Sequence, residues 1–141
     1  MNRLLVFGIT AALGGFACAA FAQTHSPKDE INTAHAHAMM AQSATSVAMA
    51  HTHLHHVINC LVGPNGSGFE AAAGDPCKGQ GNGAIPDAAS DHAMHAKLES
   101  ALSDAQAGLK SESLAAVQQD AGKAAAGLRD GSSAKASSSS W

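Results

Sequence analysis

A shortage of large apolar side chains most limits what this chain can fold into. Residues 23–141 contain 26 Ala but only 15 Leu, Ile, Val and Phe, which is 13% of that stretch. A packed core becomes doubtful below about 20% of such residues. Because Ala is the best helix former, we expect thin helices that pack closely through small side chains. So thin a core needs a covalent staple or a bound ligand.

The charge balance excludes one class of partner. The chain has 8 Lys and Arg against 11 Asp and Glu, a formal net charge of −3 at pH 7. Without a basic surface there is no electrostatic field to attract nucleic acid, so we expect no nucleic-acid partner. The length of 141 residues is that of a single domain.

The first 22 residues have the organisation of a secretory signal peptide. Arg3 supplies the positive charge, residues 4–16 are apolar, and Ala-Phe-Ala at 20–22 is a small-x-small cleavage site. We therefore predict export to a bacterial periplasm, with Gln23 as the new N-terminus and no stable membrane insertion after cleavage. The alternatives are an uncleaved membrane anchor, which the glycines of the apolar stretch disfavour, and a lipoprotein acylated at Cys18.

Cleavage would remove Cys18 and leave two cysteines, Cys60 and Cys77. An even pair in an exported chain predicts a disulfide. This bond would close a loop at residues 63–84, which contains seven Gly and two Pro and has no helical or strand period. The alternative is that both thiolates ligate a metal such as Cu(I).

Apolar periodicity and helix-terminal residues predict three helices, over residues 28–62, 87–109 and 112–129. Ser26 and Pro27 are typical of a helix start, and no Gly or Pro follows them until Gly63. The polar stretch 43–46 is a place where this long first helix could bend.

These helices define the predicted fold class. The second and third predicted helices are joined by few residues, so they should pack antiparallel. The sequence thus predicts an all-α, three-helix bundle, made of one long helix plus an antiparallel helical hairpin, with a disulfide-stapled Gly-rich loop. We expect this helical domain to cover residues 23–131. The Ser-rich tail, residues 132–141, should be disordered because it has too little apolar surface to bury.

The histidines carry the functional argument. The chain has nine His, and four of them lie within residues 51–56. At 100° per residue, one face of the first predicted helix, nearly opposite its apolar face, carries a set of possible ligands. This set comprises His35, Met39, Met49, His53, His56 and Cys60. Within it, Met49 and His53 are spaced i, i+4, and His53 and His56 are spaced i, i+3, which places their side chains on adjacent turns.

Further His pairs could complete a metal site. His51 and His55 are spaced i, i+4 on the flank of the apolar face, and His92 and His95 are spaced i, i+3 on the second predicted helix. Ligands from two helices of a bundle often converge on one ion, so we expect His92 and His95 to close the site. We assign His37 to the flank of the first helix rather than to the ligands.

Neutral imidazole is the commonest protein metal ligand. A neighbouring thioether favours Cu(I), whereas imidazoles alone suit Cu(II), Zn, Ni or Co. The sequence therefore predicts transition-metal binding, with copper favoured by the four Met that follow the signal peptide. A metal-bridged homodimer is compatible with this pattern, and any protein partner stays undefined.

Two other functions fit the same residues. The His-rich face could be a pH-responsive surface of a structural or interaction protein of the cell envelope, or it could hold haem through His and Met axial ligands. We do not expect an enzyme, because no Ser-His-Asp or Cys-His arrangement and no phosphate-binding loop is recognisable.

Residues 92–129, HAMHAKLESALSDAQAGLKSESLAAVQQDAGKAAAGLR, resemble the repeat of small His-rich periplasmic metal-binding proteins. Those proteins are helical bundles that bind several divalent metals, copper among them. His95-Ala96-Lys97 matches their repeat, whereas Asp120 and Gly127 stand where that family tends to place His. The resemblance therefore implies metal ligands mainly on the first two helices. Residues 53–77 are also similar to an uncharacterised family of exported proteobacterial proteins, which implies no particular activity.

Overall fold

The structure is a computed structural model that describes residues 26–133. The predicted signal peptide and all but the first two residues of the predicted tail lie outside the described residues. The described chain contains only helices and loops, which confirms the all-α prediction. In order, the elements are α1 (Lys28–Gln42), α2 (Val47–Val62), the 3-10 turn η1 (Ala71–Ala73), α3 (Ala84–Asp87), α4 (His92–Leu109) and α5 (Leu114–Ser133).

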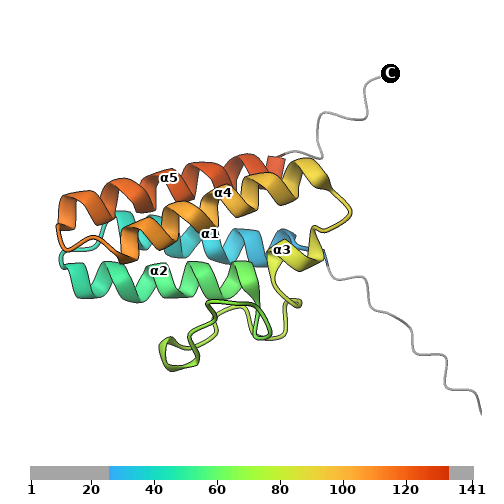
Figure 1. The fold of residues 1–141 in the computed structure, drawn as a ribbon, viewed down its shortest axis with the longest axis horizontal. Coiled ribbons are helices and arrows are strands. Elements are labelled where there is room, and N and C mark those ends of the chain that lie inside the picture. Colours follow the sequence, from blue (N-terminus) through green and yellow to red (C-terminus); the bar gives the residue numbers. More distant parts are fainter. Residues whose placement is uncertain (1–25, 134–141) are drawn as a thin grey trace, which may run out of the picture.

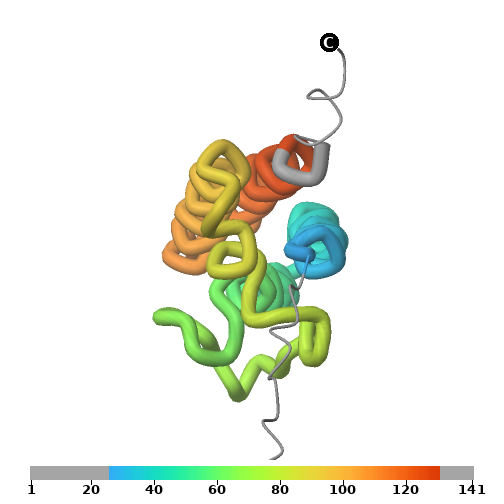
Figure 2. The backbone as a smooth tube through the Cα atoms, turned by 90° about the vertical axis from the view of Figure 1, so that its right-hand side faces the viewer, coloured from blue at the N-terminus to red at the C-terminus, as the bar shows by residue number. Residues whose placement is uncertain are grey.

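Four long helices pack as an antiparallel bundle (Figure 1). Viewed along the bundle, α1, α2, α4 and α5 occupy four corners, and the extensive contacts run around the ring, between α1 and α2, α2 and α4, α4 and α5, and α5 and α1 (Figure 2). The structure thus differs from the predicted three-helix arrangement, because the first predicted helix is two helices. Within residues 26–133, no helix combines the length and apolarity needed to cross a bilayer.

The break between α1 and α2 falls at residues 43–46, where the sequence indicated only a bend. The Ser43 hydroxyl donates to the Met39 carbonyl at 3.0 Å and satisfies a C-terminal backbone group of α1. The Ser46 hydroxyl accepts from the Met49 N–H at 3.2 Å and caps the start of α2. Because serine side chains satisfy the free backbone groups at both helix ends, the chain folds back without Gly or Pro.

The other helix boundaries also shift from the predicted ones. The helix predicted over 87–109 begins five residues later, as α4, and the short α3 precedes it. Asp91 caps α4 by accepting from the Met94 N–H at 3.0 Å. Helix α5 begins two residues after the predicted start at 112 and runs four residues beyond the predicted end at 129. Residues 132 and 133, assigned to the tail from the sequence, are therefore helical.

Small side chains build most of the core, as the composition predicts. Most of the buried apolar residues are Ala, and the largest fully buried aliphatic side chains are Ile31, Leu54, Leu61, Leu98, Leu128, Val57 and Val117. The helices also approach closely at glycine: a Cβ atom placed on Gly108 of α4 would lie 2.6 Å from a methyl carbon of Leu54 on α2. Close approach lets a chain with few large side chains exclude water from its interior.

The Gly-rich segment between α2 and α3 lies on the outside of the bundle, against α2 (Figure 2). The predicted disulfide between Cys60 and Cys77 is present, with a Cα–Cα distance of 5.2 Å. Phe69 packs against the core, and the Thr33 hydroxyl donates to the Gln80 side-chain oxygen at 3.1 Å. A disulfide that closes a loop of this length contributes roughly 3 kcal/mol in the chain-entropy description, which is large for so thin a core.

One acidic side chain is buried where this segment meets α1. Glu30 is 1% exposed, and its Oε1 atom accepts from the Gly83 N–H at 2.7 Å. Its other oxygen is buried without a hydrogen-bond partner. Burial raises the pKa of Glu30 from 4.5 to about 7; the Gly83 N–H opposes this shift, and the nearby carboxylate of Asp87 adds to it.

We predict that Glu30→Gln flattens the pH dependence of stability between pH 4.5 and 7. Because the pKa of Glu30 is higher in the folded protein than in the unfolded chain, its contribution to stability is fully present below about pH 4.5 and is lost as the pH rises towards 7. Gln can still accept from Gly83 but does not ionise. Relative to wild type, the free energy of unfolding of the variant should therefore rise by roughly 1–3 kcal/mol between pH 4.5 and pH 7.

Urea unfolding at several pH values measures this difference, and comparison with wild type cancels the titration of groups that do not interact with Glu30. Glu99→Gln, at an exposed position of α4, is the matched control and should follow the wild-type curve. Parallel curves for wild type and Glu30→Gln would contradict the prediction.

Candidate metal centre

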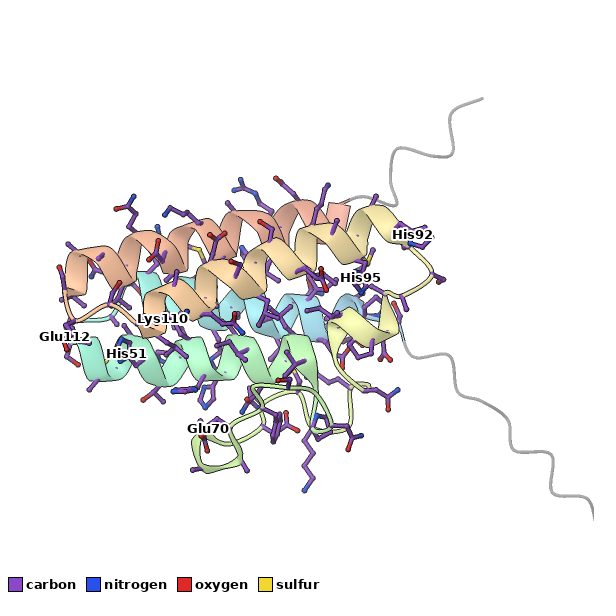
Figure 3. The ribbon with its side chains drawn as sticks, viewed as in Figure 1. His51, Glu70, His92, His95, Lys110 and Glu112 are labelled. Atoms are coloured by element: carbon purple, nitrogen blue, oxygen red, sulfur yellow. A yellow bond between two sulfur atoms is a disulfide. The ribbon has the colours of Figure 1, made fainter. Side chains whose placement is uncertain are left out.

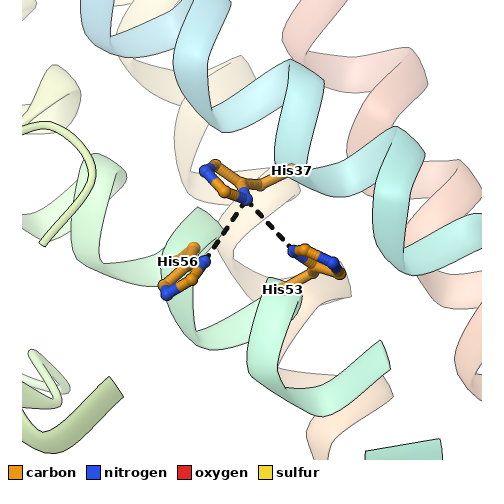
Figure 4. Close-up of side chains that lie close together, drawn as sticks. All are labelled: His37, His53 and His56. Atoms are coloured by element: carbon orange, nitrogen blue, oxygen red, sulfur yellow. Dashed lines mark hydrogen bonds between the residues drawn. The ribbon is translucent and has the colours of Figure 1, made fainter. Parts of the chain in front are cut away.

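Three histidines from α1 and α2 point their Nδ1 atoms at one another (Figure 4). His37 Nδ1 lies 3.2 Å from His53 Nδ1 and 3.3 Å from His56 Nδ1. Each residue offers one ligand atom, and the three atoms all lie within 4.8 Å of one another. All three residues are partly buried, so the cluster lies at the edge of the hairpin and could hold a metal ion.

The helical hairpin brings the three residues together. His53 and His56 are spaced i, i+3 on α2, so they share one face of that helix. His37 lies five residues before the end of α1, and His53 lies six residues after the start of α2. Because the two helices are antiparallel, these positions are level with each other across the hairpin. The turn at residues 43–46 therefore places His37 opposite the pair on α2.

A backbone carbonyl fixes the tautomer of His56. Its Nε2 atom lies 2.7 Å from the carbonyl oxygen of Ala73 in η1. A carbonyl oxygen only accepts hydrogen bonds, so Nε2 must carry the hydrogen, and in the neutral ring Nδ1 keeps its lone pair. This lone pair faces His37. Metal-bound histidines commonly donate their second ring N–H to a carbonyl in this way.

The three rings cannot satisfy one another by hydrogen bonding alone. A neutral imidazole nitrogen either carries a hydrogen or offers one lone pair, so His37 Nδ1 can satisfy only one of its two contacts at a time. A cation between the rings would satisfy all three nitrogens together. Ligand nitrogens about 2.05 Å from a tetrahedral ion lie about 3.3 Å apart, and two of the three separations in the cluster, at 3.2 and 3.3 Å, are close to this value.

The surroundings of His37 and His53 disfavour the protonated, charged form of both rings. Burial, followed by repulsion from the neighbouring His56 and His53, lowers the pKa of His37 from 6.5 to about 4. Burial also lowers the pKa of His53, with a further contribution from His56. A metal ion therefore competes with few protons for these lone pairs.

The structure brings together part of the predicted ligand set. His53 and His56 meet as their spacing indicated, and His37, which we assigned to the flank, lies between them. The expectation for His37 is wrong because one continuous helix was assumed across residues 43–46. With that assumption, the direction of the His37 side chain relative to those of α2 is calculated wrongly. Ser43 and Ser46, which cap the two helices at the break, are the sequence signal that could have indicated a turn here.

The other predicted ligands lie elsewhere. His51 contacts the Ser111 carbonyl through Nε2 at 3.0 Å, which ties α2 to the turn between α4 and α5. His92 and His95 lie at the end of the bundle opposite His51 (Figure 3), and they do not join the three clustered histidines. The reason is that α4 begins at His92, whereas the cluster lies midway along α2.

Helix geometry separates the remaining candidates from the cluster. His55 and His35 lie about 160° around their helices from His53 and His37, respectively, and Met39 lies about 160° from His37 on the other side. Met49, by contrast, lies one turn from His53 on the same face of α2 and is 48% exposed. Among the described residues, the three clustered histidines are the one group of His, Cys, Asp or Glu with metal-binding geometry.

We predict that His37→Ala weakens metal binding although the sequence pattern did not select this residue. Loss of a direct ligand should reduce affinity by more than the roughly 10–100-fold that loss of an outer hydrogen-bond partner costs. Competition with a chromogenic chelator for Zn(II) measures the change. His55→Ala on α2 is the matched control and should keep wild-type affinity; an equal loss in both variants would refute the assignment of His37.

Comparison of the chain with protein-family models, with curated proteins and with solved structures finds no match.

Proposed function

We propose that this protein binds and buffers a transition-metal ion, with copper favoured, through His37, His53 and His56. The observation that carries the proposal is the convergence of one ring nitrogen from each of the three histidines, all within 4.8 Å of one another. The hydrogen bond from His56 to Ala73 supports it, because this bond leaves the Nδ1 lone pair free. The lowered pKa of His37 supports it as well, because a ligand must be unprotonated to bind.

The number of ligands favours a site that exchanges its ion. Structural zinc sites are closed by four protein ligands, whereas three protein ligands leave a position for water or an incoming donor. The cluster supplies three ligands, and no other described His, Cys, Asp or Glu joins them. An open position allows another ligand to attack the bound ion, which suits storage and release better than permanent retention.

The preference for copper rests on two exposed thioethers beside the cluster. Met49 lies one turn before His53 on α2, and Met40 lies one turn after His37 on α1; the two are 48% and 46% exposed. Both methionines lie between the histidines and the turn at residues 43–46. Thioether sulfur favours Cu(I), whereas the imidazoles alone would accept Cu(II), Zn, Ni or Co. We propose that the exposed Met49 thioether is the donor that reversibly occupies the open fourth position when Cu(I) is bound.

We further propose that the protein acts in the periplasm. The signal-peptide pattern of residues 1–22 supports export. The Cys60–Cys77 disulfide is in keeping with an oxidising compartment. The resemblance of residues 92–129 to small periplasmic metal-binding proteins points the same way, and it rests on the sequence motif.

Metal titration tests the proposal. We expect wild type to bind about one equivalent of Cu(I), Zn(II) or Ni(II) tightly at the cluster, and His53→Ala/His56→Ala to lose that equivalent. His92→Ala/His95→Ala also removes two histidines at i, i+3 spacing and is the matched control, which should keep it. Absence of tight binding in wild type, or unchanged stoichiometry and affinity in the cluster variant, would overturn the proposal.

The identity of the metal has its own test. Met49→Leu should weaken Cu(I) binding by about tenfold, or about 1.4 kcal/mol, and leave Zn(II) affinity unchanged, because only the soft ion gains from sulfur. Met39→Leu is the matched control, since Met39 is 47% exposed and points away from the cluster. Equal Cu(I) affinities in the two variants would exclude Met49 as a ligand and remove the main argument for copper.

A second candidate function follows from the lowered pKa values of His37 and His53. Protonation of a close imidazole cluster in acid would make like charges repel, so the same face could be a pH-responsive interaction surface. Thermal unfolding with and without metal separates the two. A metal-binding protein gains stability from its ion at neutral pH, whereas a pH-responsive surface loses stability in acid and does not respond to metal.

A further inference from the structure

One side chain of α2, Asn59, binds the backbone of the short stretch that carries the Ala73 carbonyl. Asn59 is 0% exposed and lies one turn after His56 on α2. Its Nδ2 atom donates to the carbonyls of Glu70 and Gly74, at 2.9 and 2.6 Å, and its Oδ1 atom accepts from the Glu70 N–H at 2.8 Å. A buried amide with three hydrogen bonds fixes both ends of the stretch 70–74 relative to α2.

The geometry inside this stretch directs the Ala73 carbonyl at His56. The 3-10 turn η1 lies between the two attachment points, and the Glu70 side chain caps it by accepting from the Ala72 N–H at 3.0 Å. Gly74 then reverses the chain with φ +90°, a conformation that residues with a side chain rarely adopt. The Ala73 carbonyl oxygen thereby reaches 2.7 Å from His56 Nε2.

We propose that Asn59 is a positioning residue for the metal centre: by clamping residues 70–74, it makes the Ala73 carbonyl select the His56 tautomer whose Nδ1 binds metal. This inference rests on the proposed function. Outer hydrogen-bond partners of metal-bound histidines orient the ring and raise its basicity, and their loss costs about 10–100-fold in metal affinity. The Gly-rich segment is therefore part of the metal site although it supplies no ligand.

The stretch 70–74 can be perturbed without altering the core. Gly74→Ala places a Cβ 3.9 Å from His56 Nε2 and strains the backbone beside the Ala73 carbonyl. Gly79→Ala is the matched control, because Gly79 has a similar φ of +83° in the same segment and nothing lies within 4 Å of its Cβ position. Asn59→Leu is the second variant, which removes all three hydrogen bonds at similar side-chain volume.

Two readouts test the inference. In the metal-free protein, the ¹⁵N resonances of the His56 ring should report one tautomer, with the hydrogen on Nε2. Gly74→Ala and Asn59→Leu should give mixed tautomers or rapid exchange of that hydrogen. In Zn(II) titrations, Gly74→Ala should bind about tenfold more weakly than Gly79→Ala. A merely structural loop would lower the stability of both glycine variants alike and leave the tautomer unchanged.

The possible failures are distinguishable. If wild type binds Zn(II) through the three histidines but Gly74→Ala binds it as tightly as Gly79→Ala, the inference on the loop is overturned and the proposed function stands. If metal-free wild type carries the hydrogen on Nδ1 of His56, the inference is overturned whether or not metal binds. If wild type binds no metal, the proposed function fails as well. If Asn59→Leu does not fold, the comparison of Gly74→Ala with Gly79→Ala still tests whether residues 70–74 control the His56 tautomer.

Discussion

The turn between α1 and α2 is the constraint on which the rest of the structure depends. Ser43 and Ser46 satisfy backbone groups at the two helix ends that face each other across this turn, and Gln118 of α5 donates to the Ala44 carbonyl within it at 2.9 Å. Without the turn, α1 would continue past α2 instead of packing beside it. The fourth corner of the bundle would then be missing, and His37 would lie far from the histidines of α2.

The thin core and the metal centre have a common physical basis. Helices lined with Ala and Gly approach closely, and the same close approach brings ring nitrogens from two helices to 3.2 and 3.3 Å. The cost is that three imidazoles crowd one another. Burial and repulsion from the neighbouring histidines lower the pKa of His37 to about 4, so this ring is uncharged at neutral pH and its lone pair is available to a cation.

The Gly-rich segment between α2 and α3 contributes both to the stability of the fold and to the metal centre. It is attached to the bundle by the Cys60–Cys77 disulfide, by the Asn59 amide and by the Gly83 N–H on Glu30. It reaches the histidine cluster through the hydrogen bond between the Ala73 carbonyl and His56. A segment of this composition has no structure of its own, because Gly loses more backbone freedom on folding than any other residue. These attachments offset that loss and give the segment one conformation.

The sequence by itself determined the helical class, the Ala-based packing, the disulfide and the pairing of His53 with His56. Each of these follows from composition or from spacing along one helix, which are local properties. The tertiary structure alone decided the number of long helices, the part played by His37 and the distance of His92 and His95 from the cluster. These depend on how the chain turns at residues 43–46 and on where α4 begins. A helical wheel assumes one continuous helix, so it cannot relate the directions of side chains on the two sides of a turn. The capping serines mark where the turn lies, but only the packing of α1 on α2 places His37 beside His53 and His56.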